Sequence, residues 1–208
     1  GKLEPSSFGS MQRRIGLTGG IASGKSSVGR LLEARGWPVL DADRFARDAL
    51  APNTPASEAV VERFGDAVGT AAHLNRKALR RIVFSDPSER RWLEALIHPV
   101  VRDRFQEELE RHSHEPVVVL MIPLLFEAGL ESLCSEIWLV NCSPEQQLAR
   151  MMQRDGLTEE EAQARLLAQW PLARKRNLAD QVIENSGALD ALVAAVNRCD
   201  PPSPGTTW

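Results

Sequence analysis

The feature that most constrains this chain is a glycine-rich stretch near its beginning, G-G-I-A-S-G-K-S at residues 19–26, which fits the pattern G-x-x-x-x-G-K-[ST] in full. Glycines let the backbone curl so that successive N–H groups point inward and form a nest for an anion. Lys25 can neutralise β- and γ-phosphate charge, and the Ser26 hydroxyl can bind Mg²⁺. An apolar run at 14–18 precedes the stretch and an amphipathic pattern at 26–35 follows it, which is the context this motif requires. We therefore predict that residues 19–26, called the phosphate loop below, bind a nucleoside triphosphate.

Apolar, strand-like runs alternate with helical patterns along much of the chain. The run at 117–122 is rich in β-branched residues, which suits a strand buried on both faces of a parallel sheet. Ser143 followed by Pro144, and Thr158 followed by three glutamates, are typical helix starts. The alternation predicts an α/β fold with three layers, a mostly parallel five-stranded sheet flanked by helices. We expect its strands at 14–18, 37–40, 117–122, 136–141 and 181–183.

Two stretches interrupt this alternation. Residues 43–112 carry helical patterns and no convincing strand, although a crossover between parallel strands needs only about a dozen residues. Residues 150–177 are also helical and highly charged. We therefore expect a nucleotide-binding core, a helical acceptor-binding insertion and a lid, with a tag remnant and a tail at the ends. The expected boundaries are 11–42, 116–149 and 178–199 for the core, 43–115 for the insertion, 150–177 for the lid, 1–10 for the tag remnant and 200–208 for the tail.

The charge balance and the apolar runs argue against some classes of protein, although the net charge leaves room for a local basic patch. The chain has 25 Lys and Arg against 28 Asp and Glu, a net charge of −3, whereas a nucleic-acid binder usually needs a basic surface. The longest apolar run, at 117–126, is shorter than the roughly 20 residues that span a bilayer, and the N-terminus lacks an apolar signal core. Cys134, Cys142 and Cys199 form no C-x-x-C pair, so we expect free thiols in a reduced, cytoplasmic setting.

Small-molecule kinases, switch GTPases and mechanical ATPases share such a loop. A GTPase needs an Asn-Lys-x-Asp guanine reader, which this sequence lacks, although residues 66–69 fit the weak D-x-x-G pattern. A mechanical ATPase usually has an apolar strand that ends in Asp, whereas the run at 117–122 ends in Pro123. A kinase needs an acceptor site and a closing lid, which the two insertions could supply. A kinase with another nucleoside-like acceptor and a regulatory nucleotide-binding ATPase remain the alternatives.

Two acidic residues, Asp41 and Asp43, directly follow the second predicted strand. Ligands of open parallel sheets sit at the carboxyl ends of the strands, so this pair is expected beside the phosphate loop. Phosphoryl transfer to a hydroxyl needs a proton acceptor and carboxylates for Mg²⁺. Alternatively, one of the two caps the helix that begins near Asp43.

Taken in order, these motifs resemble the dephospho-coenzyme A kinase family. The resemblance starts with residues 16–26 and 41–47 and covers about residues 11–199. Ser27 and Ala22 stand where the family often has Thr and Gly. The later matching motifs are Ile97-His98-Pro99, Pro123 to Glu127, Gln147 with Arg150, Arg154 and Asp155, Gln169, and Asp180 to Gly187.

The resemblance implies a P-loop NTPase fold and ATP-dependent phosphorylation of the ribose 3′-hydroxyl of dephospho-coenzyme A. This reaction gives coenzyme A and ADP and is the last step of coenzyme A biosynthesis. The implied cofactors are ATP and Mg²⁺. The implied partner is a small-molecule substrate, with no nucleic acid and no membrane, and the protein is expected to be a monomer or a weak homo-oligomer.

The resemblance also implies roles for individual residues. Asp43 matches the general base, and Lys25 and Arg154 match groups that stabilise the transferring phosphoryl. Each assignment has a structural alternative: His98 can act only in packing, Arg150 and Arg154 can form a solvated basic helix face, and Asn185 and Gly187 can form an ordinary turn. Lys175 and Arg176 are expected in solvent. The implied nucleotide site is Gly20, Ile21, Ala22, Ser23, Gly24, Lys25, Ser26, Ser27, Asn185 and Gly187; the acceptor site is Asp43, His98, Leu125, Glu127 and Arg150; the metal ligands are Ser26 and Asp41.

Overall fold

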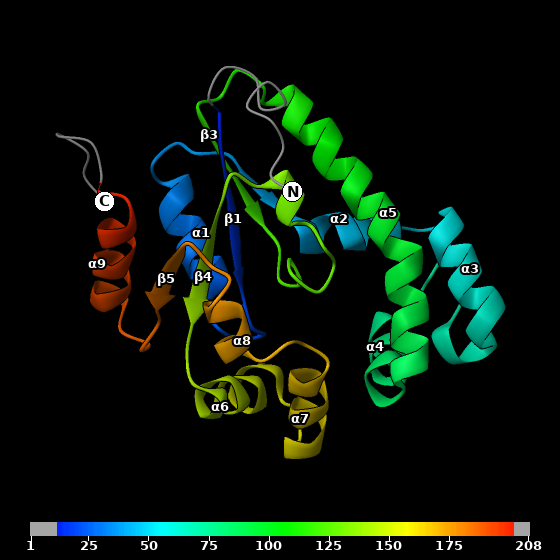
Figure 1. Ribbon diagram of the computed structural model, residues 1–208. Coiled ribbons are helices and arrows are strands. Elements are labelled where there is room, and N and C mark those ends of the chain that lie inside the picture. The colour runs from blue at the N-terminus through cyan, green and yellow to red at the C-terminus, as the bar shows by residue number, and fades with distance from the viewer. Residues whose placement is uncertain (1–11, 202–208) are drawn as a thin grey trace. The chain divides into compact units, whose positions relative to one another are not determined.

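A computed structural model describes residues 12–201 of the chain (Figure 1). The predicted tag remnant at 1–10 and residues 202–208 of the predicted tail lie outside this range. Asp200, the first residue of that tail, forms ion pairs with Arg13 at 2.9 Å and Arg35 at 3.7 Å. The chain is therefore anchored to the folded core as far as Asp200.

Five strands form one sheet in the order β2-β3-β1-β4-β5, and every described pair is parallel. The predicted parallel five-stranded sheet is confirmed. This order puts the strand that leads into the phosphate loop at the centre, between β3 and β4. The strands are β1 (Arg13–Gly19), β2 (Val39–Asp41), β3 (Val117–Met121), β4 (Glu136–Asn141) and β5 (Gln181–Glu184).

The second strand differs from its prediction at 37–40, because it begins at Val39. Pro38 has no N–H to donate to the sheet, and its carbonyl accepts a hydrogen bond from Val119 at 2.9 Å. The strand continues through Asp41, which lies opposite Met121 of β3. Asp41 is therefore the last ladder residue of β2, at the edge where the phosphate loop leaves β1.

Helices cover both faces of the sheet. The helices α1 (Lys25–Glu33) and α9 (Leu189–Cys199) cover one face. The helix α8 (Leu172–Arg176) and the short helix η3 (Glu131–Leu133) lie on the other, where Leu172 packs against Leu139. A large buried cluster brings alternate strand residues together with both covering helices on the first face: Ile15, Leu17, Val119, Trp138, Val140, Ile183, Val28, Leu32, Leu192 and Val196.

Two further helices, α6 (Pro144–Asp155) and α7 (Glu159–Leu167), precede α8 in the connection from β4 to β5. Each begins at the predicted cap residue. The cap is reciprocal in both, between Thr158 and Glu161 as predicted and also between Ser143 and Gln146. In each cap the two side chains accept hydrogen bonds from backbone N–H groups that have no partner within the helix. The capped helices pack on the phosphate loop through a small cluster of Ala22, Met151 and Ala162.

Residues 42–107 form a second compact unit with its own core. It contains α2 (Ala42–Ala49), α3 (Pro55–Phe64), η2 (Gly65–Val68), α4 (Arg76–Ser85) and most of α5 (Pro87–Arg111). Residues 42–112 are all described, and their β pairing is one isolated bridge between Gly69 and Leu74. The D-x-x-G match at 66–69 starts within η2 and follows no strand. The core of the unit consists of Val60, Val68, Leu79 and Val83, flanked by Phe64 and Trp92 in edge-to-face contact.

Within residues 12–201, no helix has both the length and the apolar character needed to cross a membrane.

Candidate nucleotide site

The phosphate loop turns from β1 into α1 through backbone angles that L-residues rarely adopt. Gly24, the N-cap of α1, has φ +100°, and Ala22 has φ +59°. A Cβ atom on Gly24 would overlap the side-chain amide of Asn185. Glycine at position 24 is therefore required twice, by the left-handed backbone and by this close approach.

Lys25 lies at the first position of α1, and its Nζ donates to the Gly20 carbonyl at 2.7 Å. This bond folds the lysine back over the loop. The ammonium group therefore lies beside the loop backbone, where it can neutralise a bound phosphate.

Side chains from distant elements donate hydrogen bonds to carbonyl groups of the loop. Arg150 of α6 donates through Nη1 to the Ala22 carbonyl at 2.9 Å and through Nη2 to the Asn185 carbonyl at 3.3 Å. Asn185 follows β5, and its Nδ2 donates to the Ser23 carbonyl at 2.8 Å, while its Oδ1 accepts from Gly187 N–H at 3.1 Å. The structure thus brings Arg150, Asn185 and Gly187 together with the loop.

Sequence reasoning assigned no role to two residues that also hold the loop. Gln147 donates through Nε2 to the Ile21 carbonyl at 2.9 Å, and Gln169 Oε1 accepts from Ile21 N–H at 2.8 Å. Gln147 is three residues before Arg150, so the two share one face of α6. That shared face was the local signal that could have identified Gln147; Gln169 offers no local signal.

Two oxygen-bearing residues are predicted to hold a magnesium ion at this edge. Ser26 is exposed at the second position of α1, and Asp41 ends β2 in the same row of the sheet as Leu17 of β1. Mg²⁺ takes hard oxygen ligands and is usually bound by one or two protein groups plus substrate phosphates and water. Residues 12–201 contain no cluster of three or more His, Cys, Asp or Glu that could hold a metal. Ser26 and Asp41 carry oxygen atoms of the kind that Mg²⁺ takes as ligands.

Arg154 lies near the end of α6 with 62 % of its side chain exposed. It makes two hydrogen bonds to Asp155, at 3.0 and 3.2 Å. This pairing raises the pKa of Arg154 and lowers the pKa of Asp155. The guanidinium is charged, and its exposure leaves it accessible to a ligand.

Glu127 and Lys175 differ from their sequence-based placement. The prediction that Lys175 lies in solvent is wrong: its side chain is 0 % exposed, and its Nζ is 2.8 Å from Glu127 Oε2. The same carboxylate oxygen accepts from Trp170 N–H at 3.0 Å. The neighbouring Leu125 is fully buried and packs beneath Gly16. Arg176, by contrast, is 55 % exposed, as expected.

The remaining predicted site residues belong to the unit formed by residues 42–107. Asp43 is the second residue of α2 and is exposed. His98 is half-buried in α5, directly before Pro99, and the helix continues through this proline. Both are positioned by helices of that unit.

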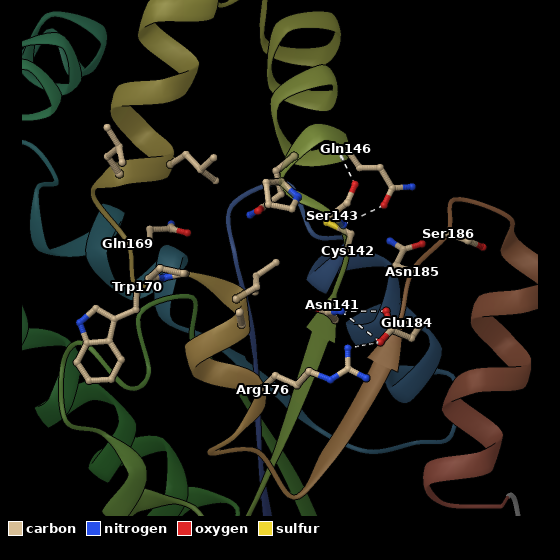
Figure 2. Close-up of a pocket in the computed structure, with 17 residues that line it drawn as sticks. Asn141, Cys142, Ser143, Gln146, Gln169, Trp170, Arg176, Glu184, Asn185 and Ser186 are labelled. Carbon is tan, nitrogen blue, oxygen red and sulfur yellow. Dashed lines mark hydrogen bonds and ion pairs between the residues drawn. The ribbon is translucent and has the colours of Figure 1, made fainter.

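A pocket of about 830 Å³ opens at the carboxyl ends of β4 and β5 (Figure 2). At the strand ends, Glu184 accepts from Asn141 at 2.9 Å and pairs with Arg176 at 3.0 Å. Gln169 and Asn185 face each other across this pocket in Figure 2. Because both side chains also bind the phosphate loop, the pocket adjoins the loop and has the size of a small-molecule site.

All three cysteines are free, as expected. Burial raises the pKa of Cys134 to about 12, so this thiol stays protonated at neutral pH. Burial also raises the pKa of Cys142, which lines the pocket, although Arg150 opposes the shift. Neither thiol is activated as a nucleophile.

Comparison with known proteins identifies the family. A sequence profile described as dephospho-CoA kinase matches residues 13–191. A dephospho-CoA kinase of Parasynechococcus marenigrum is 76 % identical over 198 residues, which cover 95 % of this chain and all of that protein. A crystal structure from Thermus thermophilus is 43 % identical, with a TM-score of 0.75, and covers 91 % of this chain and 97 % of its own. Dephospho-CoA kinase from Campylobacter jejuni is 27 % identical, with a TM-score of 0.65, and covers 91 % of this chain and 96 % of its own.

The similarity to the Campylobacter jejuni kinase covers 91 % of this chain, which folds into a parallel five-stranded sheet with flanking helices. The P-loop kinase fold predicted from the motifs is therefore confirmed. Use of ATP and a small-molecule acceptor follows from membership of a kinase family. The match of the profile over most of the chain, together with relatives that align almost end to end, leads to one conclusion: the chain belongs to the dephospho-CoA kinase family.

Proposed function

We propose that the protein transfers the γ-phosphoryl group of ATP to the ribose 3′-hydroxyl of dephospho-coenzyme A, giving coenzyme A and ADP in the last step of coenzyme A biosynthesis. The observation that carries this proposal is the phosphate loop with Lys25 folded over it, in a chain of this kinase family. The phosphate loop supports ATP as the phosphoryl donor, and membership of the family supports dephospho-coenzyme A as the phosphoryl acceptor.

ATP binds along residues 20–27, and Asn185 and Gly187 border the nucleotide. Support for this placement comes from the hydrogen bond between Asn185 and the loop. Ser26 and Asp41 hold Mg²⁺, which supplies charge neutralisation for the phosphates when bound. When ATP binds, the Lys25 ammonium group leaves the Gly20 carbonyl and donates to a phosphate oxygen instead.

Asp43 accepts the proton of the ribose hydroxyl. The new bond joins O3′ to the γ-phosphorus, the bond from that phosphorus to the β–γ bridging oxygen breaks, and ADP leaves. Only Ala42 separates Asp43 from Asp41, which limits the distance between their Cα atoms to about 7 Å. One carboxylate is therefore available for the metal and the other for the proton.

Arg154 and Arg150 stabilise charge on the transferring phosphoryl group. The exposed guanidinium of Arg154 supports this role, because it can turn from Asp155 to a ligand. Residues 150–177 act as a lid that brings Arg154 to the phosphates when substrates bind.

The helical unit, within residues 43–115, binds the acceptor through Asp43 and His98. The sequence predicts three further acceptor residues. Leu125 and Glu127 contribute from the interior, since Leu125 is fully buried and Glu127 supports α8 through Lys175, whereas Arg150 contacts the phosphate loop. We place the reaction in the cytoplasm and expect a monomer or weak homo-oligomer, which sedimentation velocity would test.

The decisive measurement is ADP production with and without dephospho-coenzyme A. We expect strong stimulation and a product that carries one added phosphate at the ribose 3′ position, identified by mass and by phosphorus NMR. Stimulation by a different nucleoside-like acceptor would favour a kinase of another substrate. ADP production at a rate that no acceptor changes would favour a slow regulatory ATPase.

A further inference from the structure

Four successive carbonyl groups of the phosphate loop each accept a hydrogen bond from a side chain. The four donors come from three parts of the chain. In order along the loop, Gly20 accepts from Lys25 at 2.7 Å, Ile21 from Gln147 at 2.9 Å, Ala22 from Arg150 at 2.9 Å and Ser23 from Asn185 at 2.8 Å.

In a trans peptide the carbonyl points away from the N–H of the next residue. A side chain that fixes the Ile21 carbonyl therefore also fixes the direction of the Ala22 N–H, and one that fixes the Ser23 carbonyl fixes the Gly24 N–H. The Ser23 N–H closes the turn onto the Gly20 carbonyl at 3.2 Å. The amides of Ala22 and Gly24 thus point opposite to the bound carbonyls.

We propose that Gln147 and Asn185 are positioning residues, which aim the N–H groups of Ala22 and Gly24 at the phosphates of the nucleotide without their side chains touching it. Both are almost fully buried, with 2 % and 9 % of their surface exposed. Gln169 completes the arrangement by accepting from Ile21 N–H. Backbone amides bind an anion strongly only when their direction is fixed in advance.

The arrangement requires a donor at position 147. The Ile21 carbonyl can only accept, so the amide nitrogen of Gln147 must face it, and a carboxylate there would repel it. Gln147→Glu changes one atom of the side chain and removes this donor at neutral pH. A carboxyl group regains an O–H donor when it is protonated. Burial raises the pKa of such a group, while the Arg150 guanidinium on the same face of α6 opposes this shift.

The adjacent residue supplies a matched control. Gln146 uses its side-chain oxygen to accept from Ser143 N–H at 3.1 Å, in the cap of α6. Gln146→Glu adds the same charge to the same helix, one residue away, and keeps the acceptor. A carboxylate is also favourable in the first turn of a helix.

The test is calorimetric titration of the full-length variants with ADP at pH 8 and pH 5.5. At pH 8 we expect Gln147→Glu to weaken ADP binding at least tenfold and Gln146→Glu to change it less than twofold. At pH 5.5 the deficit of Gln147→Glu, relative to the wild type at the same pH, should shrink at least threefold. Equal affinities of the two variants at pH 8, or a deficit that does not change with pH, would overturn the proposal.

Asn185→Asp provides a second test if Gln147→Glu fails to fold, because it removes the donor to Ser23 in the same reversible way. Asn185→Leu removes the donor permanently and should show a deficit at both pH values. If Asn185→Asp and Asn185→Leu weaken ADP binding equally at pH 5.5, the assignment of Asn185 as a positioning residue is contradicted.

This inference rests on the proposed function only in requiring that the loop hold nucleotide phosphates. ADP binding needs no acceptor, so the two can fail separately. A wild-type protein that binds ADP but shows no stimulation by dephospho-coenzyme A would overturn the acceptor assignment and leave the roles of Gln147 and Asn185 standing.

Discussion

Lys175 of α8 and Glu127, which follows β3, form a buried ion pair with 2.8 Å between Nζ and Oε2. Only 14 % of the Glu127 side chain is exposed, and none of Lys175. Lys175 also donates to the Pro123 carbonyl at 3.3 Å. The pair therefore ties the helix at the base of the proposed lid to the segment that leaves the central sheet.

Removing one partner of this pair should destabilise the protein strongly, because the other charge is left buried without compensation. We expect Lys175→Met and Glu127→Gln each to lower the free energy of unfolding by about 3 kcal/mol. The double variant should lose less than the sum of the two. Urea denaturation of all four proteins completes the cycle, and additive losses would show that the two groups are not coupled.

The same pair predicts a pH dependence of stability. Burial lowers the pKa of Lys175, against the opposing effect of Glu127. Between the lowered pKa and the ordinary value of 10.5, the unfolded chain binds more protons than the folded protein. The stability of the wild type relative to Lys175→Met should therefore rise with pH as it approaches 10.5. A relative stability that falls over this range would contradict the shift.

Asp43→Asn should lower kcat by about 100-fold or more, because an amide cannot accept the proton of the acceptor hydroxyl. ADP affinity should change less than threefold. Asp48→Asn is the control, since Asp48 lies on the same helix, where it pairs with Arg104 at 3.2 Å. Steady-state kinetics with saturating acceptor provides the measurement. Near-normal turnover of Asp43→Asn would assign the base to another group.

Arg154→Ala should lower kcat by about 1000-fold while ADP affinity stays within threefold, because the guanidinium acts on charge that develops during transfer. Arg111→Ala provides the comparison, since Arg111 is also an exposed arginine paired with a carboxylate, Glu108. Its kcat should change less than twofold. Equal kcat values for the two variants would remove Arg154 from the mechanism.

Gly24→Ala should abolish tight ADP binding. The left-handed backbone at φ +100° costs an L-residue about 1–2 kcal/mol, and the new Cβ would push against the Asn185 amide. Gly129→Ala separates these effects, because Gly129 also has positive φ, at +66°, but an added Cβ meets nothing within 4 Å. Thermal unfolding should show a modest loss for Gly129→Ala. ADP calorimetry should show a defect for Gly24→Ala alone.

Local sequence predicted the elements whose stabilising residues are neighbours along the chain. Examples are the β-branched run of β3, the helix caps at Ser143 and Thr158, and the glycine-rich turn into α1. Each depends on residues within a few positions of one another. In each of these patterns the residues that stabilise the element are part of the pattern itself, and the structure contains all three kinds of element.

The contacts that complete the site depend on residues far apart in the chain. Gln147 is 126 residues from Ile21, and Asn185 is 162 residues from Ser23. Lys175 stands in a basic run that is typical of a solvated helix face, and only the distant Glu127 makes its burial possible. No local sequence pattern identifies a polar partner that becomes a neighbour only when the chain folds.

The position of β1 at the centre of the sheet has a consequence for synthesis on the ribosome. Its ladder partners begin at Val117 and Glu136, and the side chains that hold the phosphate loop come later still, up to Asn185. The helical unit at 42–107 is contiguous and can close its core as soon as it has left the exit tunnel. The phosphate-binding segment is therefore translated early but matures among the last parts of the nascent chain, and a prematurely terminated product would carry the motif without the ability to hold a nucleotide.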